Sequence, residues 1–204
     1  MRTIRIIEHI SLDGVIQGPG GPEEDPTNGF DHGGWAFPHH DEAGGAAIDA
    51  AQGRGFDLLL GRRTYDIFAR YWPHEQGDMA DSLNAARKYV ATHRPESLGW
   101  GPVEGLGADV AASLRRIKAG DGPDLIVWGS STLTPPLIAE RLADEVVLLV
   151  FPVLIGRGRR IFSDVVNPQE MTLLRSQTTP AGVIVSTYRP DGPMRTGSFA
   201  DAAA

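Results

Sequence analysis

The chain has 204 residues, and a folded chain of this length buries roughly 70% of its unfolded surface in a full-sized core. Hydrophobic residues make up 41% and charged residues 22% of the sequence, which argues against a disordered chain, a collagen-like chain and a coiled coil. The net charge of −7 has the wrong sign for a general binder of nucleic acid or anionic membranes, and the lack of cysteine excludes disulfides, thiolate nucleophiles, zinc ribbons and iron–sulfur clusters.

The first predicted element is a strand. Ile4–Ile10 is rich in β-branched residues and runs into Ser-Leu-Asp-Gly at residues 11–14, which is typical of a turn. Charged residues interrupt this apolar run, so it does not resemble a signal peptide, and no stretch approaches the roughly 20 apolar residues that cross a bilayer. We therefore expect a cytoplasmic protein.

A long loop rich in glycine and proline follows this strand. Gly18–Gly34 contains six glycines, several acidic residues and few apolar ones. A loop of this length inside a compact domain is unusual unless it has a function. We expect a substrate lid that is mobile when empty and is held mainly by contacts with the ligand.

The middle of the chain alternates strands with helices. Four near-continuous apolar runs are typical of strands covered on both faces: Asp57–Leu60, Lys88–Ala91, Asp124–Trp128 and Glu145–Leu154. The predicted helices are Asp41–Gln52, Thr64–Tyr71 and Asp109–Ala119. In the last of these, Asp109 is a good N-cap and Gly120 a good stop. This alternation implies a mostly parallel sheet with helices on both faces.

The C-terminal part changes character. Glu145–Leu154, Met171–Thr178 and Val183–Arg189 follow one another without an intervening helix, so they should pair antiparallel at one edge. The expected fold class is α/β, with a mixed sheet in a single domain over residues 1–189 and a flexible tail over residues 190–204. Because Glu145–Leu154 is almost entirely apolar, we expect an uncovered edge or face there and a homodimer that uses it.

Polar and basic groups follow three of the predicted strands and form candidate anion sites. These groups are Gly61, Arg62, Arg63 and Thr64 after one strand, Thr92, His93 and Arg94 after the next, and Gly129, Ser130, Ser131, Thr132 and Leu133 after the third. The first combines guanidinium groups with a helix start that Thr64 can cap, and the third offers backbone N–H groups suited to a pyrophosphate.

Each group has a structural alternative, namely a helix cap with solvated arginines or a simple polar loop. Agreement among the three favours a ligand, because the carboxyl ends of parallel strands meet at one edge of a sheet, where ligands bind. A dinucleotide needs separated phosphate contacts, and a 2′-phosphate needs a local positive charge in a chain of net charge −7. The groups therefore predict NADP(H) rather than a mononucleotide.

Other motifs fail on their context. Gly156–Ile161 begins like G-x-G-x-x-G, but it lacks the third glycine and no amphipathic helix follows. Neighbouring side chains in the run from His39 to Glu42 point in different directions, and no second ligand cluster accompanies them, so we expect no metal. The sequence contains no G-x-S-x-G and no G-K-[ST] signature.

Taken together, these motifs resemble the dihydrofolate reductase-like family, and within it the reductase domain of the bifunctional deaminase-reductase of riboflavin biosynthesis and its stand-alone relatives. The resemblance spans Arg2–Arg189 and rests on the three strand-end groups together with Ser11–Ile16 and Asp144-Glu145. It implies a mixed sheet of that type with NADPH bound across it. The three strand-end groups would then hold, in chain order, a phosphate, the adenosine 2′-phosphate, and the pyrophosphate with the nicotinamide ribose. The backbone around His9 and Ile16 would meet the carboxamide.

Two features depart from this family. Pro135 and Pro136 lie where a helix is expected, so we predict a short turn over Ser130–Leu133 and a helix that starts at Pro135 with Thr134 as its cap. The carboxylate that faces the pterin in folate reductases has no clear counterpart, and the candidates are Asp41, Glu42 and Asp49. Folate reduction is therefore less expected than action on another substrate.

Two aspartates are candidate catalytic residues. Asp41 starts the first predicted helix, and Asp13 lies after the first strand, close to the hydride position by resemblance. The alternative for Asp13 is a turn in which its side chain bonds the backbone near Gly14.

Several aromatic residues are candidates for stacking on a flat heterocycle. We expect substrate contacts from Trp35, Tyr65, Phe68 and Phe151, with Phe37 as a further candidate. The alternative is that these side chains simply belong to the core.

The expected function is an NADPH-dependent reductase that transfers hydride to a small heterocyclic (pterin-, pyrimidine- or flavin-like) or carbonyl substrate, with catalysis mainly by positioning. The alternative is a non-catalytic sensor of nucleotide or flavin on the same fold. A third possibility, the reduction of a ribosylaminopyrimidine in the riboflavin pathway, requires a phosphate site for the substrate. The sequence offers only Arg157, Arg159 and Arg160 for that site.

Overall fold

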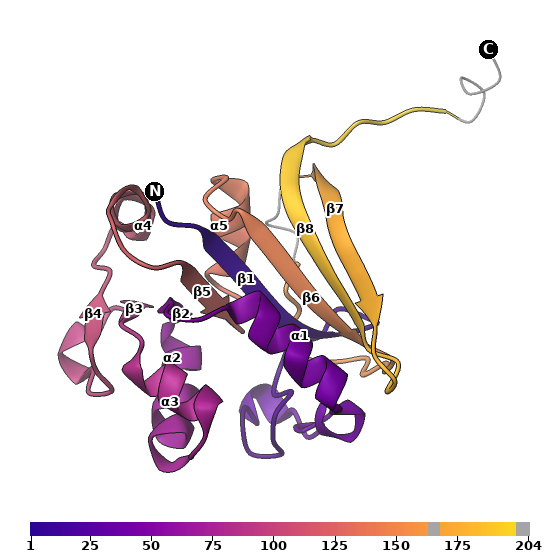
Figure 1. Ribbon diagram of the computed structural model, residues 1–204, viewed down its shortest axis with the longest axis horizontal. Coiled ribbons are helices and arrows are strands. Elements are labelled where there is room, and N and C mark those ends of the chain that lie inside the picture. Colours follow the sequence, from indigo (N-terminus) through magenta and orange to yellow (C-terminus); the bar gives the residue numbers. More distant parts are fainter. Residues whose placement is uncertain (163–167, 199–204) are drawn as a thin grey trace.

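One mixed sheet of eight strands organises the chain, in the order β4-β3-β2-β5-β1-β6-β8-β7 (Figure 1). The computed structural model describes residues 1–162 and 168–198. The strands are β1 Ile4–Ser11, β2 Asp57–Gly61, β3 Lys88–Ala91, β4 Val103–Gly105, β5 Leu125–Trp128, β6 Glu145–Phe151, β7 Gln169–Thr178 and β8 Ile184–Pro193.

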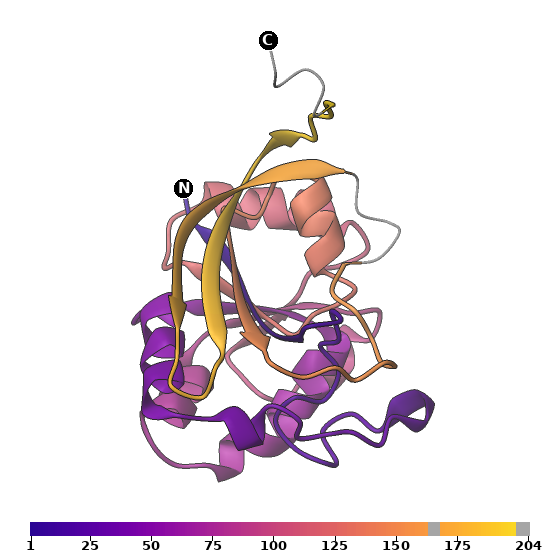
Figure 2. The ribbon, with the colours of Figure 1, turned by 90° about the vertical axis from the view of Figure 1, so that its right-hand side faces the viewer.

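The sheet has a parallel part and an antiparallel part. Strands β4, β3, β2, β5, β1 and β6 pair in parallel, whereas β8 pairs antiparallel with both β6 and β7. Figures 1 and 2 show β7 and β8 as a long curved hairpin beside β6. The predicted α/β fold with an antiparallel C-terminal edge is therefore confirmed.

Helices cover both faces of the sheet, as predicted. The α-helices are α1 Glu42–Gln52, α2 Arg62–Tyr71, α3 Asp78–Ala85, α4 Val110–Ala119 and α5 Thr134–Ala139. Short 3₁₀ helices lie at Thr27–Gly29, Phe37–His39, Trp72–His74 and Pro95–Ser97. In the described part of the chain, no helix is long and apolar enough to cross a membrane.

The alternation of side chains along β1 explains the two layers. Ile7 packs in a buried cluster with side chains of α1, α2 and α3, whereas Ile4 and Ile6 pack in a second cluster with α4 and α5. Because side chains alternate along a strand, His9 lies on the face of α1–α3 and Glu8 on the face of α5. Strand β5 ends at Trp128, opposite Ile7, while β1 continues along β6 to Ser11.

The helix starts confirm some predictions and correct others. Asp109 caps α4 through a 2.9 Å bond from the Ala112 N–H, as predicted. Thr64 does not cap α2, because the helix begins at Arg62 and its N-cap residue is Gly61. Thr134 likewise does not cap α5, because it is itself the first helical residue, and its buried hydroxyl has no partner among the described residues.

The C-terminal region differs from its prediction in two ways. Strand β8 continues to Pro193, which pairs with Gln169, so the predicted domain end at residue 189 falls inside a strand. Strand β6 pairs with β1 on one side and β8 on the other, so the edge of the sheet belongs to β7 and not to the apolar run at residues 145–154. Within the predicted tail, residues 199–204 lie outside the described part.

Candidate active site

A cavity of about 750 Å³ opens at the carboxyl ends of the parallel strands. Its floor is formed by β1, β5 and β6, and its walls by α1, α2 and α3. The loop after β1 forms its rim, with residues 16–25, 36, 37 and 39–41 in contact with the cavity. A cavity of this size can hold a small molecule together with part of a cofactor.

One end of the cavity is a polar platform that joins three strand ends. The Gly61 N–H at the end of β2 donates to the Ser130 hydroxyl after β5 at 2.9 Å. The same hydroxyl lies 3.3 Å from the Thr64 hydroxyl in the first turn of α2. Arg62 donates to the Thr92 hydroxyl after β3 at 3.2 Å. Three groups that are far apart in the sequence therefore form one bonded unit, hereafter the platform.

The first turn of α2 offers free backbone donors to this platform. Its N-cap residue, Gly61, has no side chain, so no side chain bonds the first N–H groups of the helix. A Cβ atom at Gly61 would lie 3.4 Å from the Ser130 hydroxyl, which shows how closely the two loops approach. The free donors and the helix dipole favour an anion at this end of α2.

The arginines of this region have different partners. Arg62 is committed within the protein: its guanidinium bonds Asp66 at 2.8 Å, the Arg94 carbonyl at 3.0 Å and Ser97 at 2.8 Å. Arg63 lines the cavity and bonds the Thr27 hydroxyl at 2.7 Å and Asp25 at 3.3 Å. Among the described residues, the exposed Arg94 side chain has no hydrogen-bond or ion-pair partner, and His93 beside it is also exposed. Arg94 is therefore the cation with the greatest freedom to meet a phosphate.

The turn after β5 completes the platform. Gly129 lines the cavity with φ at +56°, a conformation that favours glycine. Ser131, Thr132 and Leu133 form the short turn predicted for this segment. Leu133 differs from the other predicted cofactor residues because its side chain is buried in the core under α5. Only its backbone is therefore available to a ligand.

A buried carboxyl group lies beneath this turn, and the sequence reasoning missed it. Glu8 is buried on the far face of β1, where it accepts a hydrogen bond from the Gly129 N–H. Burial raises the pKa of Glu8 well above its usual range. An acidic residue within an otherwise mainly apolar predicted strand was the signal that could have identified it.

The cavity floor is aromatic around His9. The His9 ring stacks on Trp128 with centroids 5.6 Å apart and planes 20° apart, and it contacts Phe151 at 5.4 Å. Burial, with a smaller effect of nearby His40, lowers the pKa of His9 to about 4. The imidazole is therefore neutral at physiological pH, with one nitrogen able to donate and the other to accept a hydrogen bond.

Two of the four predicted substrate residues line the cavity. Phe68 on α2 and Phe151 on β6 face it. Trp35 does not line it: its indole N–H donates to the Gln17 carbonyl at 2.7 Å, and its ring packs edge-on against Phe151. Trp35 therefore packs against Phe151, which lines the cavity, without lining the cavity itself.

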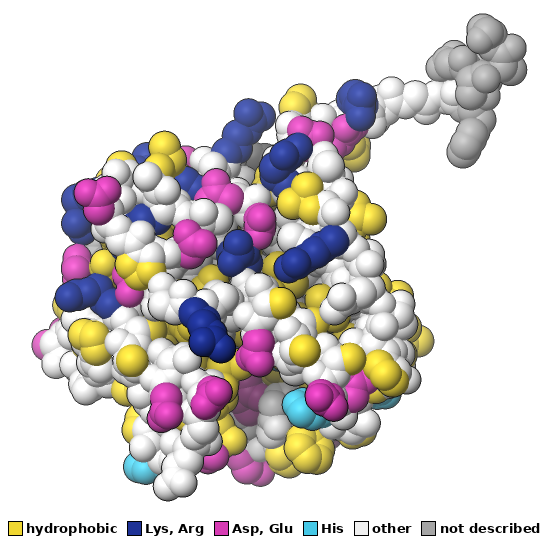
Figure 3. All heavy atoms as spheres, in the orientation of Figure 1, with side chains coloured by type: hydrophobic (Ala, Val, Ile, Leu, Met, Phe, Trp, Pro, Cys, Tyr) yellow, Lys and Arg dark blue, Asp and Glu magenta, His cyan; other side chains and the backbone are white. Residues whose placement is uncertain are grey.

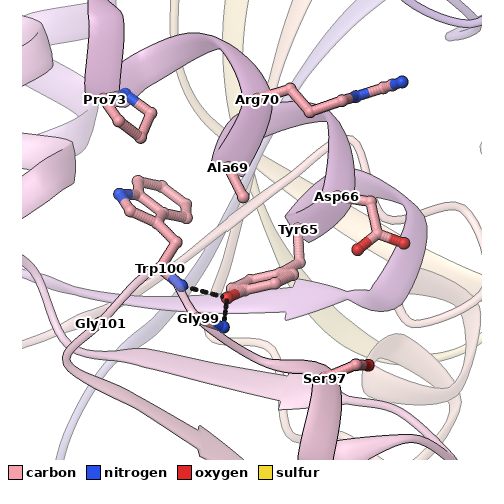
Figure 4. Close-up of a pocket in the computed structure, with 9 residues that line it drawn as sticks. All are labelled: Tyr65, Asp66, Ala69, Arg70, Pro73, Ser97, Gly99, Trp100 and Gly101. Atoms are coloured by element: carbon pink, nitrogen blue, oxygen red, sulfur yellow. Dashed lines mark hydrogen bonds between the residues drawn. The ribbon is translucent and has the colours of Figure 1, made fainter.

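Tyr65 lies on the opposite side of α2, away from the cavity. Its hydroxyl accepts hydrogen bonds from the Gly99 and Trp100 N–H groups at 3.0 and 2.7 Å. Figure 4 shows the ring in a separate, open pocket between α2 and the segment around residues 97–101. Tyr65 is 2% exposed and its hydroxyl has hydrogen-bond partners. Its position therefore agrees with the alternative that this side chain belongs to the core.

The two predicted catalytic aspartates are both held by backbone N–H groups. Asp13 bonds Ser11 at 2.6 Å and the Ile155 and Gly156 N–H groups at 3.1 and 2.7 Å, which lowers its pKa to about 2. It does not line the cavity, and this arrangement corresponds to a structural role in a turn.

Asp41 does line the cavity. It caps α1 through the Gly44 N–H at 2.6 Å and also bonds the Ala181 N–H at 2.8 Å. These two bonds lower its pKa. A carboxylate whose charged form is stabilised in this way is a poor proton donor near neutral pH.

The far wall of the cavity was not predicted. It consists of apolar side chains from α1, α3 and the segment before β8, namely Ile48, Met79, Leu83 and Val183, together with Leu149 of β6. The i, i+4 spacing of Met79 and Leu83 is a helical signal that could have identified α3. Nothing local in the sequence indicates that these segments meet.

The loop over residues 18–34 has more internal anchors than its composition suggested. Asp25 is 7% exposed and forms ion pairs with Arg159 and Arg63. The Gln17 amide donates to the Asp25 and Thr27 carbonyls at 3.0 Å each. Phe30 is buried as well. The expectation that ligand contacts mainly hold this loop is therefore corrected.

Comparisons with known proteins place the fold. The family profile described as the RibD C-terminal domain matches residues 2–185. The uncharacterized protein YyaP of Bacillus subtilis (strain 168) is 24% identical over 192 residues, which are 90% of this chain and 92% of that protein. Among solved structures, dihydrofolate reductase from Enterococcus faecalis, complexed with NADP(H), has a TM-score of 0.59 at 14% identity and covers 93% of this chain and 96% of its own.

A bifunctional enzyme is also similar. The diaminohydroxyphosphoribosylaminopyrimidine deaminase/5-amino-6-(5-phosphoribosylamino)uracil reductase of Thermotoga maritima has a TM-score of 0.60 at 17% identity. The match covers 93% of this chain and 57% of that longer protein. At these identities, the two solved structures establish the fold, which is dihydrofolate reductase-like as the sequence predicted.

Proposed function

The chain belongs to the RibD C-terminal domain family, and from this premise we propose that it is an NADPH-dependent reductase. Its acceptor is a small heterocyclic (pterin-, pyrimidine- or flavin-like) or carbonyl compound. The observation that carries the proposal is the platform, in which three strand ends with free backbone donors and a free arginine lie beside an aromatic cavity.

The platform fits an extended dinucleotide better than a single phosphate. The N-terminus of α2 with Arg63, the loop of Thr92–Arg94 and the turn at Gly129 offer separate anion contacts along one edge of the sheet. Ile16 and His9 both line the cavity, and the proposal assigns their backbone to the nicotinamide end. The cofactor supplies the hydride, and the chain's own residues bind it, orient the acceptor against it and exclude water.

A sensor that binds nucleotide without turnover is the second candidate, and one observation favours it. Both aspartates proposed for catalysis are tied to backbone N–H groups, and their pKa values are lowered. NADPH oxidation measured across pterins, flavins and quinones separates the two. Oxidation with any of these acceptors supports the reductase, whereas tight NADPH binding without oxidation supports the sensor.

The choice between NADPH and NADH tests the cofactor assignment. Arg94→Ala should weaken NADPH binding about tenfold to a hundredfold, because a charge-assisted hydrogen bond to the 2′-phosphate is lost, and it should barely change NADH binding. Titration calorimetry measures both. Arg87→Ala is the matched control, since Arg87 is an exposed arginine at the other end of β3. Equal losses for both cofactors would contradict the assignment.

We also propose that the chain forms a homodimer. With β6 enclosed in the sheet, we assign the interface to the outer strand β7, where Leu173 is 53% and Leu174 is 45% exposed. Light scattering at micromolar concentration tests this proposal, and Leu173→Lys should shift a dimer toward monomer without changing NADPH binding. A monomeric wild-type chain would contradict it.

A further inference from the structure

The three arginines that the sequence offers for a substrate phosphate each lie within ion-pair distance of an aspartate. Arg157 pairs with Asp31, Arg159 pairs with Asp25, and Arg160 lies 3.4 Å from Asp13. Of these three arginines, only Arg159 lines the cavity. Its partner carboxylate is 7% exposed, so the pair is well shielded from solvent. These ion pairs therefore join the turn around residues 156–160, which follows β6, to the loop after β1. They leave no free anion site there.

The cavity lining holds four acidic residues against three arginines, two of which, Arg63 and Arg159, pair with Asp25, so its rim has a small excess of carboxylates. Glu23, Glu24 and Asp41 line it, and Glu24 accepts bonds from the Gly20 and Gly21 N–H groups at 2.5 and 3.2 Å. On the face shown in Figure 3, acidic side chains appear in both the upper and the lower part, whereas the Lys and Arg side chains lie in the upper and middle parts and the histidines in the lower part. An anionic substituent that enters here meets like charges, which oppose its binding.

The floor and the far wall of the cavity are uncharged. Its far wall is apolar, and its floor carries the His9 imidazole between Trp128 and Phe151. Within the described part of the chain, neither ring nitrogen of His9 has a hydrogen-bond partner. One nitrogen of the neutral imidazole can donate a hydrogen bond and the other can accept one. These unpaired groups on an aromatic floor suit the polar edge of a flat ligand.

We propose that this site takes an uncharged, flat aromatic acceptor that carries no phosphate, and that His9 determines this specificity. The ring system lies on the floor of His9, Trp128 and Phe151 and extends toward Met79 and Leu83. One His9 nitrogen bonds a carbonyl or ring nitrogen of the ligand. The proposal rests on the proposed function, because it assigns the acceptor of the same cavity.

Arg70 is the rival feature. It is an exposed residue at the cavity rim on α2, and it has no ion-pair partner among the described residues. If the natural acceptor carried a phosphate, Arg70 would be the side chain available to bind it. The experiment must therefore separate recognition by Arg70 from recognition by His9.

Binding of three related probes makes this separation. Lumichrome and riboflavin are uncharged, and FMN differs from riboflavin by one phosphate. Their dissociation constants are measured by fluorescence with saturating NADP⁺, which prevents turnover. Riboflavin should bind at least about tenfold more tightly than FMN because of the acidic rim. His9→Phe keeps an aromatic ring, so it should weaken lumichrome about threefold to tenfold through loss of the hydrogen bond alone.

The controls assign each outcome. Arg70→Gln should leave the binding of all three probes unchanged. FMN that binds as tightly as riboflavin, or that loses affinity in Arg70→Gln, would overturn the proposal, as would failure of all three probes to bind. NADPH binding is measured separately on each variant. If lumichrome binds through His9 but NADPH does not bind, the reductase assignment fails and the ligand assignment stands. If NADPH binds but lumichrome does not bind through His9, only the ligand assignment fails.

Discussion

The two ends of the cavity are built in different ways. The cofactor end consists of three short segments that each follow a parallel strand directly, and these segments bond one another through Gly61, Ser130 and Thr64. The substrate end is assembled from α1, α2, α3, β6 and the segment before β8, together with a loop held by ion pairs. The first is a local, bonded construction, and the second depends on packing between segments that are distant in the sequence.

This difference suggests how such a protein can change its substrate while keeping its cofactor. The platform is fixed by sheet geometry, because the carboxyl ends of neighbouring parallel strands always meet. The shape of the far wall depends only on the packing of its apolar side chains, so a few apolar substitutions would change it. We expect mutations at the two ends to have separable effects.

The largest expected effect lies in the turn that anchors the rim loop. At Gly158 φ is +127°, and a Cβ atom would lie 2.6 Å from Val15 and 3.0 Å from Phe30. Gly158→Ala should therefore lower the free energy of unfolding by about 4 kcal/mol, from backbone strain and overpacking together. Gly156→Ala in the same turn has a positive φ but nothing within 4 Å, so it should cost only about 1 kcal/mol. Urea unfolding measures both, and equal losses would contradict the steric argument.

A buried lysine beneath the far wall gives the next effect. Lys88 is fully buried, and its ammonium donates to the Asn84 carbonyl at the end of α3 and lies 4.1 Å from the Trp100 ring centre. Burial lowers its pKa to about 8. Above that pH the folded chain releases this proton while the unfolded chain keeps it up to about pH 10.5, so stability rises with pH across this window.

Comparison with a variant isolates this contribution. Relative to Lys88→Met, the wild-type chain should gain about 2 kcal/mol of unfolding free energy between about pH 7.5 and about pH 9.5. Below about pH 7.5 the difference between the two chains should be constant. Urea unfolding at several pH values provides the measurement. Parallel pH profiles for the two chains would show that Lys88 titrates normally.

The same contrast explains what the sequence could predict. Seven of the eight strands and the helix cap at Asp109 depend on residues next to one another, and they were predicted nearly correctly, whereas the short strand β4 was missed. The three strand-end groups lie together, as the geometry of a parallel sheet requires. The far wall could not be predicted, because Met79 and Val183 meet only through packing. Trp35 and Tyr65 show the same limit, since an aromatic residue near a site can face toward it or away from it. The predicted cap of α2, Thr64, lies three residues after the true N-cap, Gly61, so Thr64 is a residue of the first helical turn instead.

The ion pairs of Asp25 hold the rim loop, so removing them is the next way to weaken the substrate end. Hydrogen bonds from Thr27 and the charges of Arg159 and Arg63 lower the pKa of this carboxyl in spite of its burial. Its contribution to stability is therefore present above the pKa of an unfolded aspartate, about 3.9, and is lost as pH falls through the lower folded value. Asp25→Asn should cost about 1–2 kcal/mol near neutral pH. It should weaken lumichrome more than NADPH, and a loss confined to NADPH would contradict this division.

The smallest expected effect tests the cofactor end. Ser130 accepts the Gly61 N–H, so Ser130→Ala leaves a buried donor unpaired and should lower the unfolding free energy by about 1 kcal/mol. Because that bond holds the β2 and β5 ends together, NADPH binding should weaken about threefold to tenfold. Lumichrome binding should not change. Ser131→Ala is the matched control for the unfolding measurement, since the Ser131 side chain has no hydrogen-bond partner among the described residues. If Ser130→Ala weakened lumichrome as much as NADPH, the two ends would be one coupled unit, and the separation drawn from their construction would be wrong.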